Sequence, residues 1–210
     1  PTWPATLTWT TAFTAGVLFF ASLLAHELSH SVVAKVRGIA VPRITLFVFG
    51  GVSELEREPD TPATELLIAI AGPAMSFLLG LVFSWLGVAL AGAGFADELP
   101  TNPEAAMAEL GPGATLFLWL GPINFMLAFF NLIPGFPLDG GRVLRAMLWR
   151  ISGDLESATL WASNAGRAFG WAIMGVGVLQ ALGANLMQGV WLLLIGWFLN
   201  NAARQSYTQL

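Results

Sequence analysis

The two histidines of the chain stand four residues apart with a glutamate between them, in the sequence His26-Glu27-Leu28-Ser29-His30. On a helix, residues four apart lie one turn apart on one face, so both imidazoles can reach one metal ion while Glu27 stands beside it. Zinc at a catalytic site takes three protein ligands and a water, and a neighbouring carboxylate can remove a proton from that water. The pattern therefore predicts a zinc site with His26 and His30 as ligands and Glu27 as general base.

A simpler interpretation places both histidines at a membrane surface, with Glu27 paired to Lys35 or Arg37. The apolar surroundings favour the metal site instead. His26 lies about eleven residues, or ~16 Å of helix, before Arg37, and each ionisable group inside a spanning helix costs roughly 2.5–3.5 kcal/mol. Three such groups within five residues need a common purpose, and a bound cation supplies one.

Two histidines leave a third protein ligand to be found elsewhere, and the candidates within or bordering apolar segments are Glu65 and Asp139. Asp139 follows Pro134-Gly135-Phe136-Pro137, which ends an apolar segment, on the side of the membrane expected for His26 and His30. We predict Asp139 as the third ligand, although Asp is also a good helix N-cap. Glu65 is interpreted as an interfacial acid in the first turn of a helix, near its dipole.

The chain that carries these groups has the composition of a membrane protein. Of its 210 residues, 56% are hydrophobic and only 10% are charged, which is too few for a water-facing surface. An apolar chain with net charge −4 and no cysteine is not expected to be disordered, to bind nucleic acid or to form a disulfide-rich secreted domain. The absence of cysteine also excludes thiolate catalysis and cysteine-based metal sites.

Five apolar stretches are long enough to cross a bilayer, which takes roughly 20 residues of helix. They cover about residues 8–36, 63–91, 114–133, 160–182 and 186–203. We expect one all-α membrane domain over residues 1–210, built as a polytopic transmembrane helix bundle. A short amphipathic helix is expected at 141–151, with Arg142, Arg145 and Arg150 on its solvent-facing side.

The segment 41–58 has a different character. It mixes β-branched and aromatic residues, contains the turn signal Gly50-Gly51, and then alternates apolar and polar residues. The pattern predicts a small β-hairpin or sheet insertion. Because the segment is too polar to face lipid, we expect it at the cytoplasmic interface or inside a cleft.

Basic residues alternate between successive connections and so predict the orientation of the chain. Those between the first two spans are Lys35, Arg37, Arg43 and Arg57, and those around the third-to-fourth connection are Arg142, Arg145, Arg150 and Arg167. The connections 92–113 and 183–189 have none, and the first of them carries the acids Asp97, Glu98, Glu104 and Glu109. The positive-inside rule then places the active site toward the cytoplasm, the acidic loop outside and the C-terminus in the cytoplasm.

The pattern His26-Glu27-x-x-His30 near the end of one spanning helix, followed by Asn131-x-x-Pro134-x-x-x-x-Asp139-Gly140 at the end of another, resembles the site-2 protease family of intramembrane zinc metalloproteases. The segments Gly50-Gly51-Val52 and Ala71-Gly72-Pro73 extend the resemblance over nearly the whole chain. The resemblance implies one Zn²⁺ per chain, held by His26, His30 and Asp139, with Glu27 activating the hydrolytic water. It also places Asn131 near the metal, where its amide would donate to the developing oxyanion or hold the substrate backbone; an interhelical hydrogen bond is the plainer role.

The function implied by the resemblance is hydrolysis of a peptide bond within or near a transmembrane helix of a membrane-protein substrate, as in regulated intramembrane proteolysis. The bilayer is the second partner, and a homo-oligomer is left open. Family members usually have a further helix before the one with the histidines, and the segment 200–207 resembles the branch that continues into CBS domains. We expect that helix and those domains in the full-length protein, and nucleotide binding only through the CBS domains.

Two other functions compete with proteolysis. A membrane metal-ion transporter would bind zinc in passing, but it should carry polar sites along a path, whereas these ionisable residues cluster at one depth. A catalytically inactive relative that only binds membrane helices has no need of Glu27. Both comparisons favour the enzyme.

Overall fold

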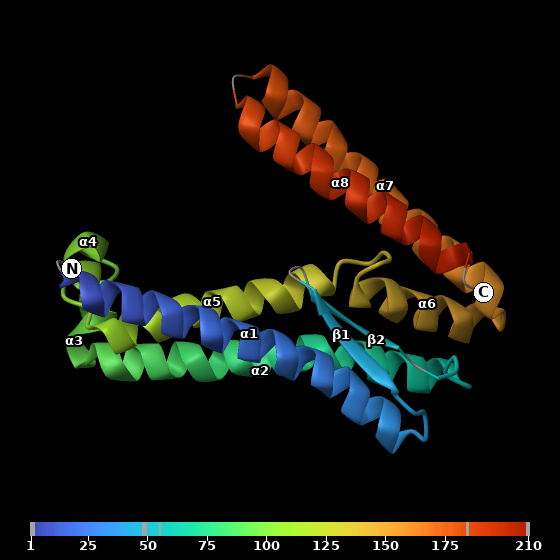
Figure 1. Cartoon of the computed structure of the whole chain (residues 1–210), viewed down its shortest axis with the longest axis horizontal. Coiled ribbons are helices and arrows are strands. Elements are labelled where there is room, and N and C mark those ends of the chain that lie inside the picture. The colour runs from blue at the N-terminus through green and yellow to red at the C-terminus, as the bar shows by residue number, and fades with distance from the viewer. Residues whose placement is uncertain (1–2, 48–49, 55, 184, 209–210) are drawn as a thin grey trace. The chain divides into compact units, whose positions relative to one another are not determined.

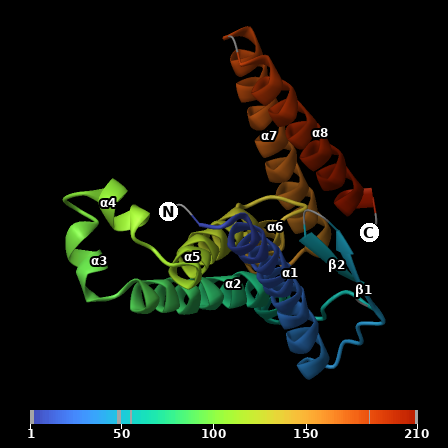
Figure 2. The same cartoon turned by 60° about the vertical axis from the view of Figure 1, so that its left-hand side comes forward.

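The structure is a computed structural model that describes residues 3–47, 50–54, 56–183 and 185–208, with the backbone alone for residues 43–47, 50–54, 96 and 206–208. In chain order its elements are α1 (Ala5–Val36), β1 (Arg43–Phe47), β2 (Gly50–Glu54), α2 (Pro62–Ala91), α3 (Ala93–Glu98), α4 (Pro103–Ala108), α5 (Pro112–Asn131), α6 (Asp139–Ser152), α7 (Leu155–Leu182) and α8 (Leu186–Thr208) (Figures 1 and 2). In the described part of the chain, α1, α2, α5, α7 and α8 are long and apolar enough to cross a membrane. The predicted helical, multi-pass membrane protein is confirmed.

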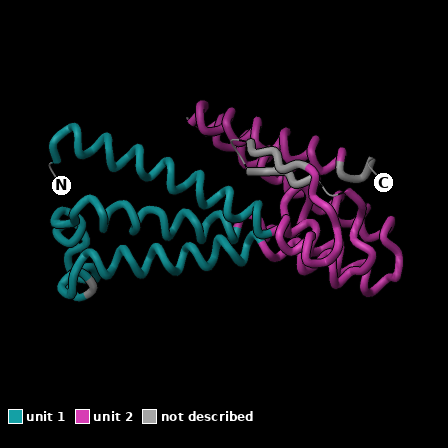
Figure 3. Tube along the Cα trace, turned by 60° about the horizontal axis from the view of Figure 1, so that its bottom comes forward, with its two compact units in different colours: residues 1–29, 43–54, 72–129 teal, residues 30–42, 55–71, 130–210 magenta. Residues whose placement is uncertain are grey.

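The chain folds into two compact units, coloured separately in Figure 3. Unit 1 contains residues 1–29, 43–54 and 72–129, and unit 2 contains residues 30–42, 55–71 and 130–210. Helices α1, α2 and α5 each continue from one unit into the other.

Helix α1 separates its side chains into two faces, with the apolar one outward. Its exposed apolar residues recur every three or four positions and are Phe13, Val17, Phe20, Leu24, Leu28, Val32 and Val36. Its buried residues follow the same spacing on the other face and include Ser22, His26, Glu27, His30, Ser31 and Ala34. This is the reverse of a soluble helix, and it suits a segment with lipid on one side and polar chemistry on the other.

In unit 1, α2 and α5 approach closely through glycines. A Cβ atom on Gly87 would lie 2.8 Å from the backbone nitrogen of Leu118, and one on Gly121 would lie 3.0 Å from that of Ser84. Small residues allow backbones to pack when lipid supplies no hydrophobic drive between helices. The ring of Phe77 fills the same contact edge-to-face with Phe125, at 5.2 Å between centroids.

The acidic connection 92–113 contains the short helices α3 and α4, which the sequence analysis did not predict. Asn102 caps α4 by accepting a hydrogen bond from the backbone N–H of Ala105, and Pro103 follows at the first helical position. Buried Phe95, Ala106, Leu110 and Ala114 form a small apolar cluster beneath them.

Strands β1 and β2 form a two-stranded antiparallel ladder inside the segment for which β structure was predicted, with Thr45 opposite Val52 and Phe47 opposite Gly50. Gly50 and Gly51 are ladder residues of β2, so the expectation that they form the turn is wrong. Residues 48, 49 and 55 lie outside the described residues. The cytoplasmic placement of this segment stays a prediction.

In unit 2, α6 packs against α7, and α7 packs against α8 along much of their length (Figures 1 and 2). Glycines again set the distance between α7 and α8: a Cβ on Gly170 would lie 2.9 Å from the carbonyl oxygen of Gly196, and one on Gly177 equally close to that of Gly189. Asp154 caps α7 by accepting hydrogen bonds from the backbone N–H groups of Glu156 and Ser157.

The loop between α5 and α6 is clamped against α7. The backbone N–H of Phe136 donates to the carbonyl of Ala162 at 3.3 Å. A Cβ on Gly166 would lie 1.9 Å from the carbonyl oxygen of Phe136, so only glycine permits this approach. Since α6 begins at Asp139, immediately after this loop, the contact fixes where that helix starts.

Replacing Gly166 by alanine should therefore destabilise unit 2, because the new methyl group meets backbone atoms of Phe136 and neither chain segment can move aside cheaply. We expect a loss of about 1–3 kcal/mol or more, measured as a lower midpoint of thermal unfolding in detergent. Gly175→Ala on the same helix is the matched control, because a Cβ there meets nothing within 4 Å. An equal effect of the two substitutions would contradict the clamp.

Candidate metal centre

His30 is held in one orientation by the backbone of α2. Its Nδ1 lies 2.6 Å from the carbonyl oxygen of Ile68, 38 residues away in the chain. A carbonyl only accepts hydrogen bonds, so Nδ1 carries the proton, and in the neutral ring the lone pair is on Nε2. That Nε2 lies 3.3 Å from Oδ2 of Asp139. The imidazole therefore presents the lone pair of Nε2 on the side of the carboxylate.

His26 lies one turn earlier on the same continuous helix, and it is also oriented through Nδ1. This atom lies 2.8 Å from the hydroxyl oxygen of Ser76 on α2. Both histidines are almost completely buried, at 3% and 4% exposure. An Nδ1 that is occupied by a hydrogen bond directs Nε2 to any bound cation, which is the usual arrangement of metal-binding histidines.

Asp139 is the first residue of α6, and the N-cap position belongs to Leu138. The alternative role of Asp139 as the N-cap residue is therefore wrong. The first turn of α6 folds tightly back on the preceding loop: a Cβ on Gly140 would lie 2.3 Å from the carbonyl oxygen of Ile133, and one on Gly141 would lie 2.3 Å from the backbone nitrogen of Phe136. The two glycines allow the turn that brings the carboxylate to His30.

His26, His30 and Asp139 each offer one ligand atom, and these atoms lie within 4.8 Å of one another. Two imidazole nitrogens and one carboxylate oxygen are a donor set that suits zinc, and three protein ligands leave a position open for water or substrate. The group could therefore hold a metal ion, as expected from the sequence.

The other two predicted site residues lie close to these ligands in the chain. Glu27 follows His26 on α1 and is 8% exposed. Asn131 is the last residue of α5 and is partly exposed, immediately before the loop that leads to Asp139.

Glu65 is not the interfacial acid that the sequence analysis expected. It does lie in the first turn of α2, but its side chain is completely buried and forms ion pairs with two arginines of α6. Arg142 Nε donates to Glu65 Oε1 at 3.1 Å, and Arg145 Nη2 donates to the same oxygen at 2.7 Å.

The expectation that the arginines of α6 face solvent is therefore wrong for Arg145, which is buried, while Arg150 is exposed. Burial by itself would lower the pKa of Arg142, but the charge of Glu65 and its hydrogen bond outweigh that effect and raise the pKa. The sequence shows an acidic residue at the start of α2 and basic residues in α6, about 80 residues later. No pattern within either segment indicates that these charges pair with each other.

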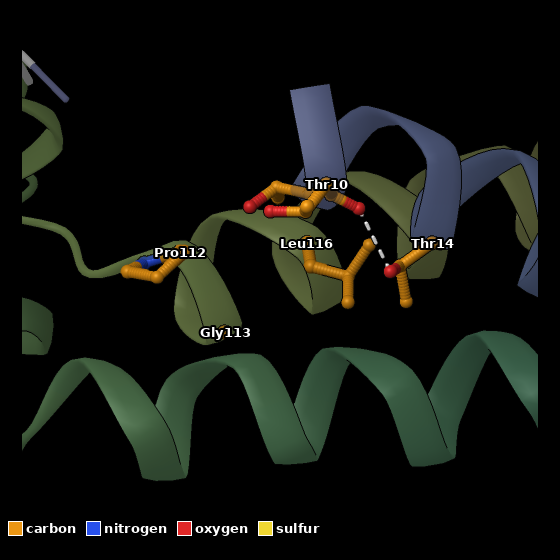
Figure 4. Close-up of a pocket in the computed structure, with 6 residues that line it drawn as sticks. Thr10, Thr14, Pro112, Gly113 and Leu116 are labelled. Carbon is orange, nitrogen blue, oxygen red and sulfur yellow. Dashed lines mark hydrogen bonds between the residues drawn. The ribbon is translucent and has the colours of Figure 1, made fainter. Parts of the chain in front are cut away.

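Unit 1 contains a pocket of about 210 Å³ (Figure 4). Thr10, Thr11 and Thr14 of α1 line it together with the start of α5. Thr14 donates its hydroxyl proton to the carbonyl of Thr10, and Thr11 donates to that of Leu7. Twelve residues of helix, or about 18 Å, separate Thr14 from His26, so this pocket is not the metal centre.

The fold and the group formed by His26, His30 and Asp139 place the chain in the class of site-2 proteases. The solved site-2 protease from Methanocaldococcus jannaschii has a similar structure, with a TM-score of 0.66 and 31% sequence identity, over 95% of this chain and 78% of that one. The family model "Peptidase family M50" matches residues 14–173. The chain belongs to peptidase family M50, and the family resemblance noted in the sequence is confirmed.

Two curated relatives carry zinc and proteolysis in their names. The chain is 40% identical over 208 residues to "Putative zinc metalloprotease Rip3" of Mycobacterium tuberculosis, which covers 99% of this chain and 49% of the relative. It is 38% identical over 164 residues to "Zinc metalloprotease MJ0392" of Methanocaldococcus jannaschii, which covers 78% and 42%. The chain thus spans about half the length of the curated relatives it matches.

The hydrogen bond between His26 Nδ1 and the Ser76 hydroxyl leads to a specific prediction about metal affinity. Ser76→Ala should weaken zinc binding by about 10-fold or more, because Nδ1 of His26 loses the partner that orients the ring. Zinc affinity of the purified chain is measured by competition with a chelator of known affinity. Ser29→Ala is the matched control, since the Ser29 hydroxyl donates to the carbonyl of Ala25 within its own helix. Equal zinc affinities for both variants would argue against the orienting role.

Proposed function

We propose that this chain is the membrane domain of an intramembrane zinc metalloprotease, which hydrolyses a peptide bond within or near a transmembrane helix of a membrane-protein substrate. The observation that carries the proposal is the His30 imidazole, whose Nδ1 is held by the Ile68 carbonyl while Nε2 lies 3.3 Å from Asp139. Membership of peptidase family M50 supports proteolysis over the transport of metal ions.

In this proposal His26, His30 and Asp139 hold the zinc ion. When bound, zinc supplies a Lewis acid that polarises a carbonyl and lowers the pKa of water. The carboxylate of Glu27 accepts a proton from the attacking water and passes it to the leaving nitrogen of the peptide bond. The side-chain amide of Asn131 donates a hydrogen bond to the developing oxyanion or to the substrate backbone.

The substrate has to be unwound before cleavage, because each peptide group in a spanning helix is hydrogen-bonded within that helix. We propose that the β1–β2 ladder offers an edge to which the unwound stretch adds as a further strand. A two-stranded sheet has an unpaired outer edge on each strand, and β2 is the strand that continues toward α2. Such an edge binds the substrate through hydrogen bonds to its backbone and not through its side chains, so it suits substrates of differing sequence.

The orientation in the membrane is part of the proposal. Arg37, Arg43 and Arg57 lie in the connection between α1 and α2, whereas the connection between α2 and α5 has no basic residue. Under the positive-inside rule, the metal centre is toward the cytoplasmic side and the end of α8 lies in the cytoplasm.

The general base is tested by Glu27→Gln, which removes the proton acceptor but keeps the size of the side chain. Zinc content should stay near one per chain, while cleavage of a membrane-helix substrate in detergent should fall by about 100- to 10,000-fold. Glu104→Gln, an exposed acid on α4, is the control and should cleave normally. Full activity of Glu27→Gln would refute the mechanism, and an inactive wild-type chain with bound zinc would favour the non-catalytic relative.

The strand-addition step is tested by single prolines in β2, at Val52 and at Ser53. Backbone N–H groups of successive strand residues point to opposite edges, so one of the two substitutions removes a donor from the outer edge of β2 and leaves the ladder with β1 paired. That variant should bind zinc normally but cleave the substrate at least several-fold more slowly. Unchanged cleavage by both variants would contradict strand addition.

A further inference from the structure

The buried ion cluster of unit 2 joins the start of α2 to the first turns of α6. Its centre is Glu65, which is 0% exposed and accepts hydrogen bonds on Oε1 from both Arg142 and Arg145. Arg145 Nη2 also donates to Glu58 at 2.9 Å. A charge buried this completely is expensive unless it is paired, so the cluster allows α6 very few positions relative to α2.

The same turn of α2 serves a second element. Ile68 follows Glu65 by three residues, so the two lie about one turn apart on the helix. The Ile68 carbonyl accepts a hydrogen bond from His30 Nδ1–H, while the Glu65 carboxylate accepts hydrogen bonds from the arginines of α6. One helical turn therefore orients an imidazole from α1 and anchors the helix that carries Asp139.

The link from Glu65 to Asp139 is short. Arg142 follows Asp139 by three residues on α6, so fixing its guanidinium fixes the turn to which the aspartate belongs. Arg145 adds a contact to the loop before Asp139, because its guanidinium lies 5.6 Å from the ring centre of Phe136. The cluster therefore contacts both α6 and the loop that precedes it.

Stability alone does not explain this arrangement. Replacing a buried ion pair by apolar residues of similar volume is often neutral or stabilising, so burying charge is a weak way to hold two helices together. Hydrogen bonds from arginine are directional, unlike apolar contacts. The N–H donors of the planar guanidinium group point in fixed directions, so only a narrow range of carboxylate positions satisfies them. Asp139, one turn away from Arg142, has to be held in a defined position to act as a metal ligand, and directional contacts can hold it there.

We propose that Glu65 is a positioning residue of the metal centre, which holds Asp139 in place relative to His30 through Arg142 and Arg145. The inference rests on the proposed function only in taking His30 and Asp139 as ligands of the same ion. Glu65 is not one of the three residues that offer a ligand atom to the ion. The effect of its removal should therefore appear as weaker metal binding, independently of the proteolytic step.

The test measures zinc affinity of the full chain purified in detergent, by competition with a chelator, for wild type, Glu65→Gln and the control Arg150→Gln. Arg150 is an exposed residue of α6. Glu65→Gln should bind zinc about 10- to 100-fold more weakly, as is typical when a residue that supports a metal ligand is lost, and Arg150→Gln should match wild type. Asp139→Ala marks the loss expected when a ligand itself is removed.

A purely structural role of Glu65 gives a different result. The metal-free variant would then unfold at a lower temperature, while zinc affinity measured well below that temperature would equal that of wild type, and this outcome would overturn the proposal. The visible absorption of the cobalt-substituted chain provides a second readout, because its band positions and intensities depend on ligand geometry. We expect an altered spectrum for Glu65→Gln and an unaltered one for Arg150→Gln.

Should Glu65→Gln fail to fold, Arg142→Lys decides the question. Lysine keeps the positive charge beside Glu65 but replaces the planar fork by a point charge. The variant should fold and still bind zinc several-fold more weakly than wild type, whereas wild-type affinity would overturn the proposal. A wild-type chain that binds no zinc would instead refute the proposed function, so the two failures are distinguishable.

Discussion

The structure depends on one constraint: an ionisable group inside an apolar helix must have a partner, because lipid provides none. The imidazole of His30 meets the constraint through the Ile68 carbonyl, and that of His26 through the Ser76 hydroxyl. Both partners belong to α2, so the position of α2 beside the histidine-bearing face of α1 follows from the chemistry of the site. The carboxylate of Glu65 meets the same constraint with two arginines of α6.

Close backbone contacts are the second means by which the elements are held. Lipid tails are as apolar as the side chains that face them, so packing between helices has to come from shape. Glycines at Gly87, Gly121, Gly170 and Gly177 bring neighbouring helices together, and Gly166 brings α7 against the loop before Asp139. The contact at Gly166 holds the loop that immediately precedes the first residue of α6.

Sequence reasoning succeeded where a signal is local and failed where partners come from distant segments. Hydropathy over about 20 residues marks each candidate spanning helix, and the ends predicted for the five differ from those in the structure by up to five residues. The acidic connection was expected to be a loop outside the membrane, and its two short helices were not predicted; Asn102 and Pro103 begin one of them. Glu65 was taken for an interfacial acid because its partners Arg142 and Arg145 are 77 and 80 residues away, and no local pattern identifies them.

The spanning helices and the one-turn separation of His26 and His30 followed from the sequence alone, because helical periodicity and transfer free energy act over a few residues. The choice of Asp139 over Glu65 as the third ligand was also made from the sequence, and it stays a prediction. The folded chain added the surroundings of the two acids, with Asp139 beside His30 and Glu65 paired with arginines. The physical reason is that a carboxylate's role depends on which charges and donors surround it, and these arrive from segments that the folded chain alone brings together.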